Sequence, residues 1–211
     1  LAKWCPEHIV LDPVMVAKSG DALLSEGARA TLKEVLLPMA TLVTPNLPEA
    51  SVLTGFPVQD LESMKEAARA IRDMGPKYVL IKGGHLEKEA LDLLFDGQKF
   101  EAYEAPRLSS RNTHGTGCTY SAALATFLAQ GLPMREAVAE GKRFITRAIR
   151  HGLAIGSGHG PTNHYAEVLL FKERARRSAI PGRGPRKCAR PLDTDLKQLR
   201  TEPPRNGEGN I

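Results

Sequence analysis

Short apolar runs alternate with segments of helical spacing, and this alternation constrains the fold more than any other feature of the chain. "HIVLDPVM" (8–15), "TLVTPN" (41–46) and "YVLIKGG" (78–84) contain β-branched residues and are bounded by Pro, Asn or Gly, which predicts three buried strands. Helical patterns lie between them. Buried strands that alternate with helices are typical of a parallel sheet with helices on its faces. We therefore expect an α/β fold.

The helices of this first half have recognisable ends. Ser25 has the side chain of an N-cap, and it begins a helix that Pro38 stops. A brief helix then closes at Gly55. Asp60 caps a longer helix whose apolar positions recur at helical spacing and which ends at Gly75. Each of the first two predicted strands is thus followed by helical segments of plausible length.

The stretch 90–105 breaks this rhythm. "ALDLLFDGQKFEAYEA" contains two alternating runs joined by Asp96-Gly97, which is the pattern of a β-hairpin. A glycine-rich turn then opens a helix that runs to about residue 130, and another helix follows Pro133. A last short helix is expected near residues 165–171.

Composition and charge divide the chain near residue 171. Of its 211 residues, 42% are hydrophobic and 25% are charged, as in globular proteins. Residues 1–171 carry a net charge of −1 and residues 172–211 one of +6, so the excess positive charge belongs to the second segment. That segment is rich in Pro and Gly and poor in large apolar residues. We expect a folded domain over 1–171 and a basic, disordered tail over 172–211.

The same counts disfavour several classes of function. No apolar run approaches the roughly 20 residues of a membrane span, and the first residues lack the pattern of a secretory signal. Three widely spaced cysteines suggest neither a disulfide framework nor a zinc site, so the expected setting is the cytoplasm. The tail has no aromatic residue on which a base could stack, and we expect no specific recognition of nucleic acid.

Polar residues collect where the predicted parallel strands end. They are Asp12 and Lys18 after the first strand, Asn46 and Glu49 after the second, and Lys82-Gly83-Gly84-His85 after the third. In open α/β sheets, ligands bind beyond the carboxyl ends of the strands. Acidic and basic side chains there, together with a glycine-rich helix start, suit a metal-bound polyphosphate and a transferred phosphoryl group.

The loop "HGTGC" (114–118) places a cysteine where a helix begins. Gly115, Thr116 and Gly117 allow successive backbone N–H groups to point into one concavity, which forms an anion hole with the helix dipole. The same dipole favours a thiolate, so Cys118 is a candidate general base for a substrate hydroxyl. The alternative is a small residue packed at a helix start, since free cysteines are commonly buried and inert. Local physics alone leaves both interpretations open.

The other strand-end candidates have structural explanations as well. Asn46 could cap a short helix, with Glu49 completing a capping box. Lys18 could be a solvated loop lysine, and Asp12 a turn residue. The chain contains neither the GxxxxGK[ST] sequence of P-loop proteins nor a GxGxxG after a strand, which disfavours both of those nucleotide-binding folds.

Five motifs, taken together, resemble a known family. They are "DPVMVAKSGDALL", "TPNLPEA", "VLIKGGH", "THGTGCTYSAALA" and "GHGPTNHY". In this order and spacing they strongly resemble the hydroxymethylpyrimidine/phosphomethylpyrimidine kinases of thiamine biosynthesis, in the ribokinase-like superfamily, over about residues 8–168. The resemblance implies a three-layer ribokinase-like sandwich with a mainly parallel sheet. It also implies ATP-dependent phosphorylation of 4-amino-5-hydroxymethyl-2-methylpyrimidine, then of its monophosphate, with Mg²⁺.

The resemblance assigns roles to the glycine-rich loop and to one lysine. By the family pattern, Gly115, Thr116 and Gly117 form the anion hole. Cys118 holds the general-base position that most ribokinase relatives fill with Asp. Lys18, in the "AKSG" loop, looks like the lysine that reaches the phosphates.

The resemblance also covers the remaining candidates. Asn46 and Glu49 match the element that organises Mg²⁺ and its waters around the phosphates. Lys82 and Gly84 match the strand end that faces the nucleotide. Met15 resembles a residue near the pyrimidine pocket.

The chain departs from the family pattern at its start. Members of the family carry a substantial portion ahead of the "DPVM" strand, which supplies the first strands and most pyrimidine contacts. We expect an N-terminally truncated member whose sheet lacks those strands and whose full-length form is a homodimer. The nearest alternative is a pyridoxal or pyridoxine kinase, because some of those share this sequence style and the cysteine. A catalytically inactive nucleotide-binding fragment and a nucleic-acid binder acting through the tail are two further alternatives.

Overall fold

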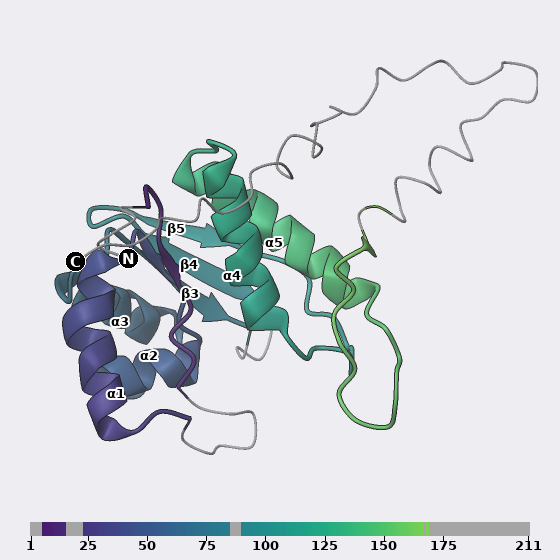
Figure 1. The fold of residues 1–211 in the computed structure, drawn as a ribbon, viewed down its shortest axis with the longest axis horizontal. Coiled ribbons are helices and arrows are strands. Elements are labelled where there is room, and N and C mark those ends of the chain that lie inside the picture. Colours follow the sequence, from purple (N-terminus) through teal and green to yellow (C-terminus); the bar gives the residue numbers. More distant parts are fainter. Residues whose placement is uncertain (1–5, 16–22, 85–89, 167, 169–211) are drawn as a thin grey trace, which may run out of the picture. The chain divides into compact units, whose positions relative to one another are not determined.

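A five-stranded mixed sheet forms the middle of the fold (Figure 1). The computed structural model describes residues 6–15, 23–84, 90–166 and 168. The strands lie side by side in chain order: β1 (Val10–Leu11), β2 (Leu42–Val43), β3 (Tyr78–Gly83), β4 (Leu91–Phe95) and β5 (Phe100–Tyr103). The first three strands are parallel, as the alternating pattern predicts. The last two continue the sheet in antiparallel fashion and form the expected hairpin.

The hairpin closes at the turn that the sequence marks. Asp96 accepts hydrogen bonds on Oδ1 from the N–H groups of Gln98, at 2.8 Å, and Lys99, at 2.6 Å. Gly97 has a φ of 94°, in the left-handed region that favours glycine. The side-chain acceptor and the glycine therefore define this turn locally.

The helices pack on the two faces of the sheet (Figure 1). They are α1 (Glu26–Thr31), α2 (Leu47–Thr54), α3 (Leu61–Asp73), α4 (Thr116–Ala129) and α5 (Met134–Arg150). The predicted caps are confirmed: Ser25 accepts a hydrogen bond from the third amide beyond it, Asp60 forms a capping box, and Gly55 ends α2 with a φ of 83°.

The first helix is less regular than its sequence pattern predicts. After α1, the chain continues as a π-helical turn over Leu32–Leu36 and a 3₁₀ turn over Leu37–Met39. Pro38 has no N–H group and cannot continue the α-helical ladder. The change of pitch leaves Leu32 and Leu37 both buried in the core.

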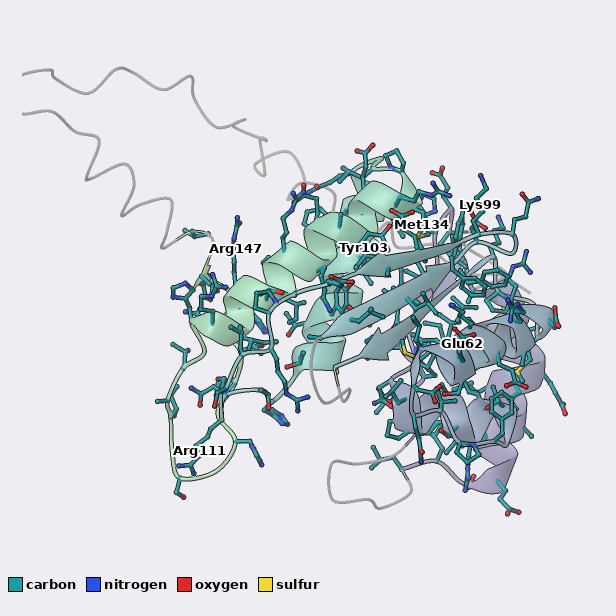
Figure 2. The ribbon with its side chains drawn as sticks, turned by 180° about the vertical axis from the view of Figure 1, so that it is seen from behind. Glu62, Lys99, Tyr103, Arg111, Met134 and Arg147 are labelled. Atoms are coloured by element: carbon teal, nitrogen blue, oxygen red, sulfur yellow. The ribbon has the colours of Figure 1, made fainter. Side chains whose placement is uncertain are left out.

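Alternating residues of the strands supply two separate cores. On one face, Val43, Val79 and Ile81 belong to a cluster with residues of α2 and α3. On the other face, the intervening strand residues form a second cluster with α4 and α5, in which Figure 2 labels Tyr103 and Met134. The strand and α4 members of this second cluster include Leu42, Leu80, Leu94 and Leu124.

Helices α4 and α5 approach each other closely at Gly141. A β-carbon at this position would lie 2.9 Å from Leu124 Cδ2 and 2.9 Å from Tyr120 Cε2. The close approach leaves no room for a side chain, so glycine permits the short distance between the two helices. This packing holds α4, whose first turn faces the ends of the parallel strands.

The end of the chain lies mostly outside the described residues. Of the short helix expected near residues 165–171, the structure describes a helical conformation only for Ala166 and Val168, and the segment 172–211 is not described. None of the helices in the described part of the chain combines the length and the hydrophobicity of a membrane span.

Candidate active site

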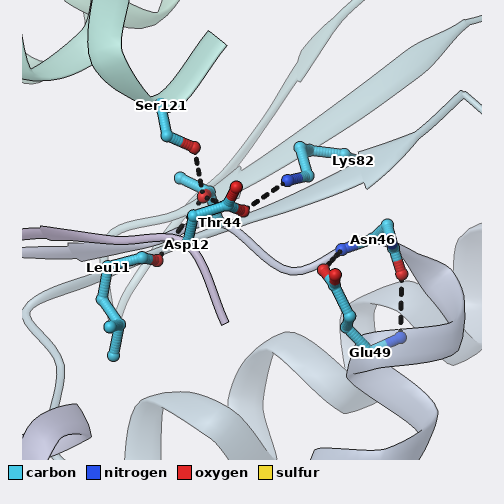
Figure 3. Close-up of polar contacts among 7 residues, drawn as sticks. All are labelled: Leu11, Asp12, Thr44, Asn46, Glu49, Lys82 and Ser121. Carbon is cyan, nitrogen blue, oxygen red and sulfur yellow. Dashed lines mark hydrogen bonds and ion pairs between the residues drawn. The ribbon is translucent and has the colours of Figure 1, made fainter. Parts of the chain in front are cut away.

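An ion pair stands where the parallel strands end (Figure 3). Lys82 Nζ lies 2.7 Å from Asp12 Oδ1, and the two side chains are 13% and 15% exposed. Thr44 donates from Oγ1 to the same carboxylate oxygen at 3.2 Å, and its hydroxyl lies 2.9 Å from Ser121 Oγ on α4. These contacts join all three parallel strands to the helix above them, as the shared edge of a parallel sheet allows.

The first turn of α4 lies directly over this ion pair. Gly115 is the N-cap of the helix and has a φ of 78°. A β-carbon at Gly117 would lie 3.4 Å from Lys82 Nζ and 3.5 Å from Asp12 Oδ2. The absence of a side chain at Gly117 therefore leaves the charged groups accessible from the helix start. The first amides of a helix have no acceptor inside the helix, and the helix dipole makes this region favourable for an anion.

A second loop fixes the approach to α4. The N–H of His114 donates to the carbonyl of Gly160 at 3.0 Å, and the N–H of Thr162 donates to the carbonyl of His114 at 3.3 Å. A β-carbon at Gly160 would collide with Asn112 Oδ1, so only glycine fits there without a shift. The "GHGPTNHY" motif therefore supports the "THGTGC" motif, and both contribute to one site.

Asn46 and Glu49 form the capping box of α2 (Figure 3). Asn46 Oδ1 accepts from the N–H of Glu49 at 2.8 Å, and Glu49 Oε2 accepts from the N–H of Asn46 at 2.8 Å. This geometry is the structural interpretation that the sequence allowed. The Glu49 side chain is nevertheless buried, and burial raises the pKa of its carboxyl group, while the bond to Asn46 and the charge of Lys82 oppose that rise.

The remaining candidates are distributed differently. Cys118 lies in the first turn of α4 and is exposed. Gly84 is exposed just beyond the end of β3, the strand that carries Lys82. Met15 is 1% exposed and belongs to the core cluster with α2 and α3. Lys18 lies outside the described residues.

The structure brings three further residues into the site: Asp12, which the sequence offered as a strand-end candidate, and Thr44 and Ser121, to which it assigned no role. Asp12 was visible as a strand-end residue, but the same position also suited a simple turn. Thr44 precedes Pro45 inside an apolar strand pattern, and Ser121 lies among the apolar residues of α4. Hydroxyl groups inside such apolar patterns are the signal that could have found them, because a buried polar group requires a partner.

The fold and the site together define a class of protein. The three-layer α/β fold with a glycine-led helix over the strand ends is shared with solved kinases of the ribokinase-like class. A solved pyridoxal kinase of Bacillus subtilis, in complex with ADP, is similar with a TM-score of 0.72 and 41% identity, over 77% of this chain and 62% of that one. A phosphomethylpyrimidine kinase from Clostridium difficile 630 has a TM-score of 0.61 and 42% identity, over 71% of this chain and 60% of that one.

The sequence comparisons identify the family. The phosphomethylpyrimidine kinase family model matches residues 1–163, and the chain belongs to that family. The thiamine biosynthesis bifunctional protein ThiED of Geobacter sulfurreducens is 56% identical over 175 residues, which cover 82% of this chain and 36% of that protein. The hydroxymethylpyrimidine/phosphomethylpyrimidine kinase of Haemophilus influenzae is 49% identical over 168 residues, covering 77% of this chain and 62% of the relative. The chain thus spans 36% to 62% of the length of these two relatives.

Proposed function

We propose that this chain carries the phosphoryl-transfer part of an ATP-dependent kinase that acts on hydroxymethylpyrimidine and its monophosphate in thiamine biosynthesis. The observation that carries the proposal is the close approach of the α4 start to Lys82, whose Nζ lies 3.4 Å from where a β-carbon of Gly117 would be. Because of this close approach, an anion at the start of α4 would contact both the backbone amides of the helix and the Lys82 ammonium. The names of the related kinases support the substrate and the pathway.

The reaction requires a hydroxyl group to attack the γ-phosphorus of ATP. A new P–O bond forms to the substrate oxygen, the bond to the β-phosphate oxygen breaks, and ADP leaves. The proton of the hydroxyl goes to Cys118, acting as the general base. The backbone amide of Gly117 and the ammonium of Lys82 stabilise the charge on the transferred group, while Thr116 already donates its N–H to the carbonyl of Thr113 at 3.4 Å.

The residues present also fit a magnesium ion bound with the nucleotide. Mg²⁺ favours one or two carboxylates together with phosphate oxygens and water, and it would neutralise charge on the phosphates. Glu49 has a buried carboxyl group near Lys82. Burial disfavours the charged form of this carboxyl group, so a cation bound beside it would stabilise the carboxylate. Asn46 already uses Oδ1 to accept from the N–H of Glu49, and we assign it the role of holding that residue in place.

Several further assignments belong to the same proposal. Lys18 would reach the phosphates, Gly84 would let the nucleotide approach the end of β3, and Met15 would contribute to the wall of the pyrimidine pocket from the core. The complete kinase would act in the cytoplasm as a homodimer. No specific nucleic acid or membrane partner is part of this proposal.

Phosphorylation of pyridoxal is the second candidate function. The observation that favours it is the similarity to solved pyridoxal kinases, among them one from Staphylococcus aureus in complex with AMP-PCP, with a TM-score of 0.73 and 40% identity over 78% of this chain and 60% of that one. The same phosphoryl-transfer site would serve either substrate, because both present a hydroxymethyl group to the anion hole. The choice between them depends on which substrate turns over faster.

The test is an ADP-release assay of the full chain with hydroxymethylpyrimidine, its monophosphate and pyridoxal. We expect turnover of the two pyrimidines to exceed that of pyridoxal. Cys118→Ser should lower turnover about 10²- to 10⁴-fold, the usual contribution of a general base, because a serine hydroxyl does not ionise near neutral pH. Affinity for a non-hydrolysable ATP analogue should stay close to that of the unaltered chain.

Cys188→Ser is the matched control, because it removes a thiol from the segment 172–211. Its turnover should equal that of the unaltered chain. Equal turnover of Cys118→Ser would exclude Cys118 as the general base. Nucleotide binding with no turnover of any of the three substrates would identify the chain as an inactive nucleotide-binding fragment.

A further inference from the structure

A second ion pair lies on the same face of the sheet. Lys142 Nζ on α5 is 2.7 Å from Asp92 Oδ2 on β4, and the two side chains are 10% and 3% exposed. The other oxygen, Asp92 Oδ1, accepts from the N–H of Gly83 at 3.1 Å. One carboxylate therefore connects α5 to the end of β3, next to the residue that pairs with Asp12.

The register of the sheet places Lys82 between two carboxylates, those of Asp12 and Asp92. Lys82 and Asp92 are directly opposite each other in the β3–β4 pair, and side chains at opposite positions share one face of a sheet. Asp12 follows β1, on the other side of Lys82 and beyond β2. Lys82 nevertheless pairs with Asp12, while Asp92 pairs with Lys142.

The pairing of Asp92 is important because of its surroundings. Burial raises the pKa of Asp92, and the Lys142 ammonium and the N–H of Gly83 oppose that rise. The neighbouring Tyr120 cannot replace Lys142, because a phenol carries no positive charge; burial and the charge of Asp92 raise the pKa of its hydroxyl. Without Lys142, Asp92 could keep its negative charge only by taking Lys82, the ammonium directly opposite it, as its new partner.

We propose that Lys142 is a positioning residue: by neutralising Asp92, it keeps the Lys82 ammonium directed at the anion site. Lys142 neutralises Asp92, so Lys82 remains with Asp12 beneath Gly117. Asp92 in turn holds the N–H of Gly83 and fixes the end of β3. The part of this proposal that concerns a bound phosphate rests on the proposed kinase function. The allocation of charges, by which Lys82 pairs with Asp12 and Lys142 pairs with Asp92, does not.

Stability alone does not account for such a pair. Replacing a buried ion pair with apolar residues of similar volume is often neutral or stabilising, whereas removing one partner is strongly destabilising. If the pair only strengthened the core, loss of either partner would affect Lys82 equally. The proposed allocation makes the two losses different, because only loss of Lys142 leaves a negative charge that competes for Lys82.

The experiment compares Lys142→Met, Asp92→Asn and the double variant in the full chain. Two readouts are the side-chain ¹⁵N resonance of Lys82 without ligand and the affinity for a non-hydrolysable ATP analogue, measured at a temperature where each variant is folded. Lys142→Met should shift the Lys82 resonance and weaken binding about tenfold, within the usual coupling of neighbouring charges. Asp92→Asn should leave the Lys82 resonance and the affinity for the ATP analogue close to those of the unaltered chain, although it lowers the free energy of unfolding.

The double variant removes both charges and keeps an oxygen for the N–H of Gly83. It should restore the resonance and bring the affinity to within about threefold of the unaltered chain. Lys65→Met is the matched control, since it breaks the Lys65–Glu62 pair on α3, 2.8 Å apart, away from this face of the sheet. Lys142→Gln replaces Lys142→Met if the latter does not fold.

An unchanged Lys82 resonance in Lys142→Met would overturn the proposal, as would equal shifts in Lys142→Met and Asp92→Asn. If the unaltered chain binds no ATP analogue, the proposed kinase function fails. The Lys82 resonance would still decide the allocation of charges in that case, so the two failures are distinguishable.

Discussion

The two faces of the sheet are built from neighbouring residues of the same strands, yet they differ in composition toward the strand ends. Toward α2 and α3, Val79 and Ile81 of β3 enter an apolar cluster. Toward α4 and α5, Leu80 is apolar but Lys82 carries a charge. Because side chains alternate along a strand, one residue can serve packing while the next serves chemistry.

The difference explains how a polar site can exist beside a closed core. Asp12, Thr44 and Lys82 are joined to one another or to α4 by hydrogen bonds or ion pairs. Partnered polar groups do not carry the full cost of burial. The apolar face then provides stability that does not depend on the charges, and three substitutions test this separation.

The largest effect is expected at Lys82. Lys82→Met should lower turnover about 10²- to 10³-fold, the usual loss when one preorganised stabilising group is removed from an active site. The affinity for an ATP analogue should fall as well, because the phosphates lose a cation. Steady-state kinetics and calorimetry measure the two effects, and Lys99→Met in the hairpin is a control that should leave both unchanged. Normal kinetics in Lys82→Met would remove Lys82 from the site.

The neighbouring residue should give the opposite result. Ile81 is fully buried, and Ile81→Ala should lower the free energy of unfolding by about 2–5 kcal/mol through lost burial and a cavity. Turnover per folded molecule should stay the same. Urea denaturation gives the stability, and kinetics corrected for the folded fraction give the turnover. A comparable loss of turnover would show that the two faces are not independent.

The smallest effect on stability is expected at Glu49, and it depends on pH. Burial raises the pKa of Glu49 above its ordinary value of 4.5, so the folded protein binds this proton more tightly than the unfolded chain. Stability from this group is therefore present at low pH and is lost as the pH rises through the raised pKa. Glu49→Gln keeps an oxygen for the N–H of Asn46 and should raise the free energy of unfolding near pH 7.

The gain in Glu49→Gln should shrink as the pH falls toward 4.5, and denaturation at several pH values measures it. The same variant should bind Mg²⁺ in the presence of an ATP analogue about 10- to 100-fold more weakly. A loss of stability near pH 7 would contradict the burial argument. Unchanged Mg²⁺ affinity would contradict the proposed metal role.

Local signals were sufficient to predict most of the fold. The caps at Ser25 and Asp60, the glycine at position 55 and the Asp96-Gly97 turn each depend on residues close in the chain. The π-helical turn after α1 was not predicted. It brings both Leu32 and Leu37 into the core, and this packing is not visible in a local sequence pattern. Strand lengths were overestimated for β1 and β2, since pairing with a neighbour decides where a strand ends.

The candidate site was predictable in outline only. The strand-end pattern placed Lys82, Asn46 and Glu49 in one region, and the glycine loop placed a helix start there. The ion pair between Asp12 and Lys82 joins residues 70 positions apart, and the contact between Thr44 and Ser121 joins residues 77 apart. Such pairings depend on the three-dimensional arrangement of the strands and helices, which no short motif contains.

The loop that fixes the start of α4 has a consequence for synthesis of the chain. Thr119 on α4 contacts His164 at 2.8 Å, 45 residues later, and His114 pairs with the segment around Gly160. At about 5–20 residues per second, the ribosome needs roughly 2 to 9 seconds to make the residues between them. The five strands of the described sheet are therefore synthesised before the loop that contacts the start of α4. A nascent chain therefore contains every strand of the described sheet before it contains the loop that fixes the start of α4.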